Sequence, residues 1–120
     1  MAENIIKVKS FNFALRIIKL SQFLNVEKKE FILIKQLFRS GTAIGALVRE
    51  SEQAESKKDF IHKLAIAQKE ANETDYWLEL LFQSDYLNQT QFQSIKTDII
   101  EINKILASII ITTKQKLSAK

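Results

Sequence analysis

Apolar residues return every three or four positions along most of this 120-residue chain, the spacing that places side chains on one face of an α-helix. Four segments show this pattern, and they predict helices over about residues 10–25, 29–53, 57–83 and 89–117. Short polar stretches separate the segments, so successive helices should run antiparallel. The pattern therefore predicts one all-α domain over residues 1–120, an antiparallel up-down-up-down four-helix bundle.

One stripe of each segment is expected to face the core. In the first two segments the predicted stripes are Phe11, Ala14, Leu15, Ile18 and Ser21, then Ile34, Leu37, Gly41, Ile44 and Val48. In the last two they are Phe60, Leu64, Ala67, Ala71, Leu78 and Phe82, then Phe92, Ile95, Ile99, Ile102, Leu106 and Ile109.

The starts of three helices carry capping residues. Ser10 is a plausible N-cap of the first helix, because a serine hydroxyl can accept a backbone N–H of the first turn. Ser56 followed by Asp59, and Asn88 followed by Gln91, have the spacing of a capping box and predict the starts of the third and fourth helices.

Both glycines of the chain lie in the second segment, at Gly41 and Gly45. Four residues apart, they share a helix face and leave a shallow groove, so they predict close approach of another helix.

Some apolar residues lie outside the predicted core stripes. Ile66 and Trp77 lie together on the third segment, and Ile100, Ala107 and Ile111 form a second stripe on the fourth. A wider core could absorb some of them. Two off-core stripes together favour self-association, so we expect a homo-oligomer with Ile66, Trp77, Ile100 and Ile111 at or near its subunit contacts.

Composition narrows the class of protein. Hydrophobic residues make up 46% and charged residues 27%, with no Pro, no Cys and two Gly, which excludes disordered, collagen-like and disulfide-scaffold chains and disfavours a sheet protein. The chain shows no signal peptide and no apolar run of bilayer length. We expect a soluble, cytoplasmic protein that does not bind membranes.

Charge is unevenly distributed along the sequence. Lys and Arg outnumber acids by nine to three over residues 1–49 and by four to none over 102–120, whereas acids outnumber bases by eleven to five over 50–101. Helices or subunits of opposite sign could pack beside one another. Alternatively, the basic ends form a surface that binds RNA or DNA phosphates, with Lys9, Arg16 and Lys19 at one end. At the other end the candidates are Lys114, Lys116 and Lys120.

The sequence holds few groups suited to catalysis or metal binding. His62 is the one histidine, and although Asp59 precedes it by three residues, a di-iron bundle needs a second such motif. Neither glycine lies in a phosphate-binding loop. We expect no catalytic residue, metal, cofactor or small-molecule substrate, and a solvated His62. A polar line on the third segment is either a helix edge that pairs with neighbouring Lys or Arg, or a binding groove; it comprises Gln68, Asn72, Asp75 and Glu79.

Three runs, residues 36–46, 56–63 and 69–81, resemble the bacterial four-helix bundle family, also called 23S rRNA-intervening sequence proteins. The resemblance extends over about residues 9–117. It implies a four-helix bundle, a ring-like homo-pentamer and no established enzymatic activity; related accessory proteins of diversity-generating retroelements form five-subunit barrels that bind nucleic acid and a reverse transcriptase. The chain departs from the family pattern at Ala43, where serine is typical, and at Leu47, where asparagine is typical, but keeps the acid at Glu50.

The leading hypothesis is a non-enzymatic, oligomeric helical bundle that binds the backbone of RNA or DNA. The alternative is a structural scaffold whose partner is another protein. Few exposed aromatic residues are expected beside the basic ends, which argues against a reader of single-stranded sequence.

Overall fold

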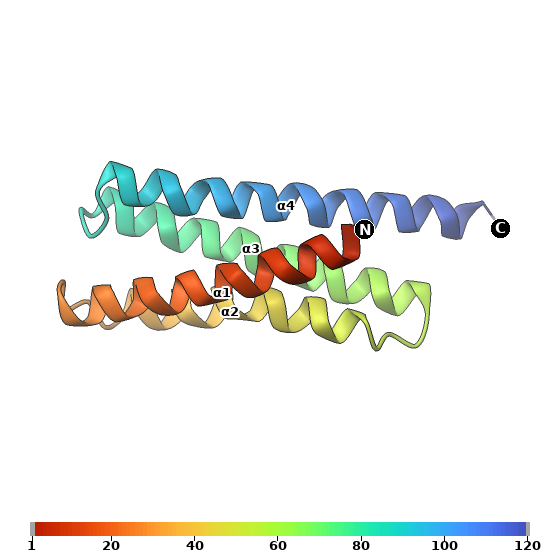
Figure 1. The fold of residues 1–120 in the computed structure, drawn as a ribbon, viewed down its shortest axis with the longest axis horizontal. Coiled ribbons are helices and arrows are strands. Elements are labelled where there is room, and N and C mark those ends of the chain that lie inside the picture. The colour runs from red at the N-terminus through yellow and green to blue at the C-terminus, as the bar shows by residue number, and fades with distance from the viewer. Residues whose placement is uncertain (1, 120) are drawn as a thin grey trace.

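The computed structural model describes residues 2–119 and contains four α-helices: α1 (Ala2–Val26), α2 (Leu33–Ser51), α3 (Lys57–Gln83) and α4 (Gln89–Ser118). Each helix packs against the next in sequence, and α1 also contacts α4. Figure 1 shows the helices lying along one rod, which measures 53 × 22 × 20 Å. The predicted up-down four-helix bundle is confirmed.

The starts of α3 and α4 lie where the capping residues predicted them. Ser56 Oγ accepts the backbone N–H of Asp59 at 3.0 Å. Asn88 and Gln91 form a full capping box, in which each side chain accepts the other residue's backbone N–H, at 2.8 and 2.9 Å. These bonds satisfy amide groups that the first turn of a helix leaves without partners.

The predicted start of the first helix is wrong, because α1 begins at Ala2 and continues through Ser10. Ile6 is buried in the core, and its burial extends the helix by two turns beyond the expected N-cap. The Ser10 side chain is fully buried, with Oγ 3.3 Å from the carbonyl oxygen of Lys7. Ser10 therefore serves as a small residue at a helix crossing and caps nothing.

The second helix is shorter than predicted, starting at Leu33 instead of about residue 29. Lys29 adopts a left-handed backbone with φ of 52°, which ends any regular helix there. The buried carboxylate of Glu30 then accepts the backbone N–H groups of Ile32, Leu33 and Ile34, at 3.1, 3.0 and 2.8 Å. Glu30 thus caps α2 from the preceding loop.

The core contains the predicted stripes of α2 and α4 in full, since every residue of both stripes is buried. On α3 the stripe from Leu64 to Leu78 is buried, while Phe60 and Phe82 at its ends are half-buried against the core. Phe82 also stacks on Phe92 of α4, with ring centroids 4.3 Å apart.

The predicted core face of α1 is wrong, because Phe11 and Leu15 point outward. Of that stripe, Ser21 alone is buried, and Ala14 and Ile18 are half-buried. The residues that α1 buries are Ile6, Ser10, Phe13, Ile17, Ser21 and Leu24. The first helix is apolar on two faces, so apolar spacing alone does not determine which of them faces the core.

The two glycines of α2 mark the place where α1 comes closest, as predicted. A Cβ added at Gly41 would lie 2.8 Å from Cγ1 of Ile17, and one added at Gly45 would lie 3.2 Å from the carbonyl oxygen of Ser10. Both contacts are shorter than ordinary van der Waals contact, so glycine is needed for α1 and α2 to pack at this distance.

Candidate assembly and nucleic-acid surfaces

An apolar strip runs along the outward face of α1. Its members are Ile5, Val8, Phe11 and Leu15, which are spaced three, three and four residues apart and are 46–59% exposed. Phe38 of α2 is 44% exposed, and Ile18 of α1 lies with it along the α1–α2 groove. We call Ile5, Val8, Phe11 and Leu15 the α1 strip. Four large apolar side chains at helical spacing form the kind of surface that a soluble partner covers.

Arg49 of α2 flanks the α1 strip. Its guanidinium carbon lies 5.3 Å from the centroid of the Phe11 ring, a distance at which a cation is attracted to the face of an aromatic ring. Thr42, Gly45 and Ala46 line the shallow groove next to this pair. Phe11 is 48% exposed beside this groove.

The four residues predicted at subunit contacts differ in exposure. Ile100 and Ile111 of α4 are 43% and 56% exposed. Ile66 is half-buried. Trp77 packs against the core and donates Nε1–H to Glu73 at 3.3 Å, while Tyr76 beside it is exposed. Ile100 and Ile111 are thus exposed for contacts with another molecule, whereas Trp77 is partly buried against the core.

Two of the predicted phosphate-binding residues are engaged in ion pairs within the chain. Lys9 Nζ lies 2.9 Å from Glu101, and Arg16 Nη1 lies 2.6 Å from Asp98. Arg16 Nη2 also donates to Ser94 Oγ at 2.9 Å. These acids belong to α4, so the basic side of α1 packs beside an acidic side of its neighbour.

Lys19, Lys114 and Lys116 have no such partner among residues 2–119. Lys19 is exposed on α1, and Lys114 and Lys116 are exposed near the end of α4. Lys120 lies outside the described residues. Figure 1 shows the C-terminal end of α4 extending beyond the other helices at one end of the rod, whereas Lys19 lies in the C-terminal half of α1. Lys19 therefore does not form a continuous surface with Lys114 and Lys116 on one chain.

The acidic middle of the sequence pairs with basic residues of neighbouring helices. On α2, Arg39 pairs with Glu70 and Glu73 of α3. The hydrogen bond that Arg39 donates to the Glu73 carboxylate, together with the charge of Glu70, raises the pKa of the Arg39 guanidinium above its ordinary value. Opposite charges thus meet across the α2–α3 contact.

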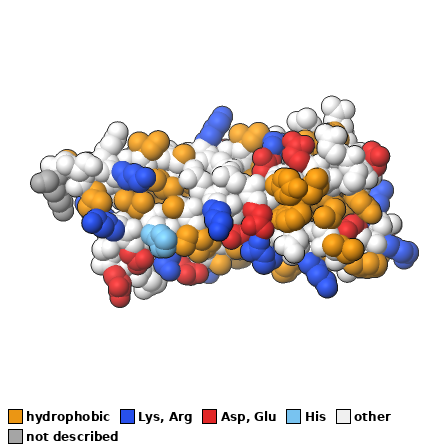
Figure 2. Space-filling model, turned by 180° about the vertical axis from the view of Figure 1, so that it is seen from behind, with side chains coloured by type: hydrophobic (Ala, Val, Ile, Leu, Met, Phe, Trp, Pro, Cys, Tyr) orange, Lys and Arg blue, Asp and Glu red, His pale blue; other side chains and the backbone are white. Residues whose placement is uncertain are grey.

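The polar line of α3 pairs in the same way with α4. Lys96 of α4 pairs with Asp75 and lies 3.9 Å from Glu79. For these two acids, the first of the alternatives, a helix edge that pairs with a neighbouring cation, is confirmed. Figure 2 shows the back face, where Lys and Arg side chains lie among Asp and Glu, and hydrophobic side chains lie in both halves of the rod, most densely in one of them.

The two positions that depart from the family pattern, Ala43 and Leu47, lie on one side of α2 together with Glu50, which keeps the pattern. Ala43 is half-buried, Leu47 is half-buried against the core, and Glu50 forms an exposed ion pair with Lys63 at 3.4 Å. Leu47 therefore contributes apolar contact where a polar residue is typical.

Among residues 2–119, no cluster of side chains is placed to bind a metal ion. His62 is exposed, as predicted. Residues 2–119 contain no group of three or more His, Cys, Asp or Glu side chains placed to hold a metal ion. Over the same residues, no helix combines the length and the apolar character needed to cross a bilayer.

The apolar spacing did not predict the α1 strip, because it placed Phe11 and Leu15 in the core and Ile5 and Val8 outside any helix. A signal was present. Residues 5–18 contain apolar residues on two interleaved stripes, which is more than one buried face requires. Only the arrangement of α2 and α4 around α1 determines which stripe is covered.

The chain is similar to known proteins of one family. The model of the 23S rRNA-intervening sequence protein family matches residues 2–108. The chain is also similar to a crystal structure of a protein with unknown function from the S23 ribosomal protein family of Bacteroides thetaiotaomicron, at 57% identity and a TM-score of 0.91. The similarity covers 92% of this chain and 98% of that one. No curated protein sequence matches.

Proposed function

This chain belongs to the 23S rRNA-intervening sequence protein family, and from its surfaces we propose that it is a non-enzymatic assembly module of the cytoplasm that associates with copies of itself. The family is one of unknown function, and its match indicates no catalytic role. The observation that carries the proposal is the α1 strip.

The energetics of the α1 strip support self-association. Each Å² of apolar surface removed from water contributes roughly 25 cal/mol, so four large side chains that are about half exposed give a substantial gain when a second copy covers them. Ile100 and Ile111 supply a second apolar region on another helix of the chain. With two separate patches, one patch of a copy can bind the other patch of the next copy, a heterologous contact that builds closed rings. The resemblance to the family implies a ring of five.

Light scattering on the full chain tests this proposal. We expect a mass several times the 13.9 kDa of one chain at micromolar concentration, five times that mass for the implied ring. The double variant Val8→Glu with Leu15→Glu should lower the mass, because it places two charges in the contact. Asn72→Glu adds a charge on α3, which does not contact α1, and should leave the mass unchanged. A wild-type monomer under these conditions would contradict the proposal.

A second candidate function is binding of the RNA or DNA backbone by the assembled protein. The observation that favours it is the exposure of Lys19, Lys114 and Lys116, which form no ion pair with the described residues. A symmetric assembly repeats each lysine once per subunit, and contacts to several phosphates add through counterion release. Lysines bind backbone charge and carry little information about base sequence, so any preference should be slight.

The nucleic-acid candidate has a direct test. Binding of a short RNA and a short DNA duplex should weaken steeply as salt rises, and a triple charge reversal at Lys19, Lys114 and Lys116 should weaken it while the assembly survives. Lys69→Glu changes the charge of an exposed lysine on α3 and serves as the control. Arg16 is unsuitable, because its reversal would also break the ion pair with Asp98. Failure to bind any single strand or duplex at low salt would rule this function out.

A further inference from the structure

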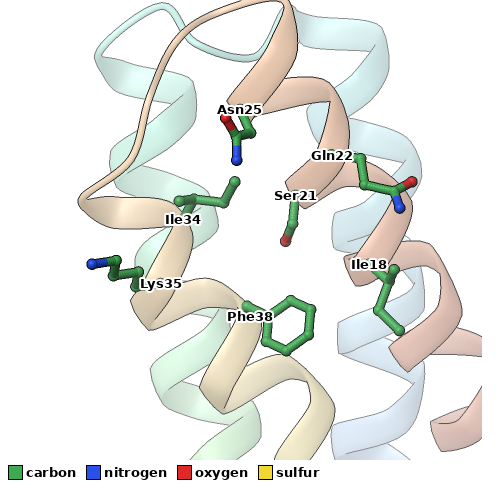
Figure 3. A pocket seen from close by; sticks show the side chains of 7 residues that line it. All are labelled: Ile18, Ser21, Gln22, Asn25, Ile34, Lys35 and Phe38. Carbon is green, nitrogen blue, oxygen red and sulfur yellow. The ribbon is translucent and has the colours of Figure 1, made fainter.

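A groove opens between the C-terminal half of α1 and the N-terminal half of α2 (Figure 3). Its volume is about 390 Å³. The lining residues are Ile18, Ser21, Gln22, Asn25, Ile34, Lys35 and Phe38. This volume lies at the lower end of the range found for small-molecule sites, and the lining is mostly apolar with a few polar groups, as in such sites.

The polar group in the floor of the groove is the hydroxyl of Ser21. The residue is 6% exposed, and Oγ has no hydrogen-bond partner among the described residues. Figure 3 shows Oγ directed from α1 into the space between Ile34 and Phe38. Buried hydroxyls nearly always have a partner, so this one is suited to a group that enters the groove.

The walls around Ser21 are apolar. Ile18 lies on the α1 side, and Ile34 and Phe38 lie on the α2 side, with the Phe38 ring at the lower edge of the opening (Figure 3). An aromatic ring packs favourably against another ring and against branched aliphatic side chains. The groove therefore favours a ligand with a compact apolar body.

The remaining polar side chains restrict the charge of that ligand. The Asn25 amide points into the groove, whereas the Lys35 ammonium and the Gln22 amide point away from it (Figure 3). No carboxylate lines the groove, and no cation points into it. Burying a charge here would leave it without an opposite charge, so a neutral ligand is favoured.

We propose that this groove is a binding site for small neutral ring compounds that carry one hydroxyl group. The ring lies against Phe38, Ile18 and Ile34, and the hydroxyl group forms a hydrogen bond with Ser21 Oγ, which is buried and becomes accessible when neighbouring side chains of the groove move. The site lies on the α1–α2 contact, and its lining includes none of Lys19, Lys114 and Lys116 and none of the residues that form ion pairs with α4.

Phenol and toluene test this site, because they share a ring and differ in the hydroxyl group. Each is titrated into the full chain and followed by the amide NMR shifts of residues 18–38. Ser21→Ala should weaken phenol binding about fivefold, the value of one neutral hydrogen bond, and leave toluene binding within about twofold. Ser108→Ala, an exposed serine of α4, should change neither.

Phe38→Ala provides a second measurement that does not depend on the hydroxyl group. Removing this wall should weaken both compounds together. The proposal is overturned if phenol shifts only resonances outside residues 18–38, or if Ser21→Ala leaves phenol binding unchanged. It is also overturned if binding appears only when the assembly is dissociated, since the groove would then be a contact between copies.

Discussion

α4 and α1 lie beside each other in the bundle, but they differ in how much of their apolar surface the chain covers. α4 turns a continuous stripe, from Phe92 to Ile109, into the core and leaves two large apolar residues, Ile100 and Ile111, exposed. α1 buries one stripe and exposes a second, the α1 strip. The α1 strip, with four exposed apolar side chains, therefore leaves a larger apolar face for another molecule than the two on α4.

The largest expected effect separates the two faces of α1. Phe13→Ala should lower the free energy of unfolding by about 3–5 kcal/mol, because it empties space in the core. Phe11→Ala should cost less than about 1 kcal/mol, since it removes an exposed ring and its contact with Arg49. Urea unfolding measures both, in the background of Val8→Glu with Leu15→Glu so that association does not contribute. Equal losses would mean that the assignment of α1 faces is wrong.

A smaller effect tests why α1 lies so close to α2. Gly41→Ala should destabilise the protein by about 1–2 kcal/mol, because the clash with Ile17 exceeds the gain in helix propensity. In a background of Ile17→Ala, where the clash is absent, the same substitution should be neutral or stabilising. Thermal unfolding of the four proteins gives the coupling. A loss that persists in the Ile17→Ala background would contradict this explanation.

The smallest effects compare the start of α4 with the predicted start of α1. Asn88→Ala should cost about 1 kcal/mol of unfolding free energy, because it removes the acceptor of a capping box. Ser10→Ala should change stability by less than about 0.5 kcal/mol, since Ser10 lies inside a helix and caps no backbone N–H. Chemical denaturation measures the unfolding free energy of both variants. A loss of stability in Ser10→Ala as large as in Asn88→Ala would mean that Ser10 caps a helix.

The difference between α4 and α1 explains why the sequence predicts the buried face of one helix and not of the other. In residues 92–109 six apolar residues at three- and four-residue spacing fall on one face and few apolar residues lie elsewhere, so the spacing identifies both the helix and its buried face. At residues 5–18 the spacing identifies a helix but fits two faces. The choice between them depends on Gly41 and Gly45, which bring α2 against the Ser10 and Ile17 side of α1.

The candidate sites were less predictable than the fold, for a related reason. Lys9 and Arg16 have the spacing of a basic stripe, but the register between α1 and α4 places Glu101 and Asp98 beside them. Helix register depends on contacts far apart in the sequence, which periodicity does not contain. The sequence likewise did not indicate that the Ser21 hydroxyl lacks a hydrogen-bond partner, because a serine in a helix usually bonds to a nearby backbone carbonyl.

The most direct test of the account compares one charge placed on each outward apolar region, with the assembly mass measured by light scattering. Leu15→Glu charges the α1 strip, and Ile111→Glu charges the region of α4 that the sequence alone predicted. We expect Leu15→Glu to lower the mass toward that of one chain at micromolar concentration, and Ile111→Glu to lower it less. An unchanged mass for Leu15→Glu, with dissociation of Ile111→Glu, would contradict the account.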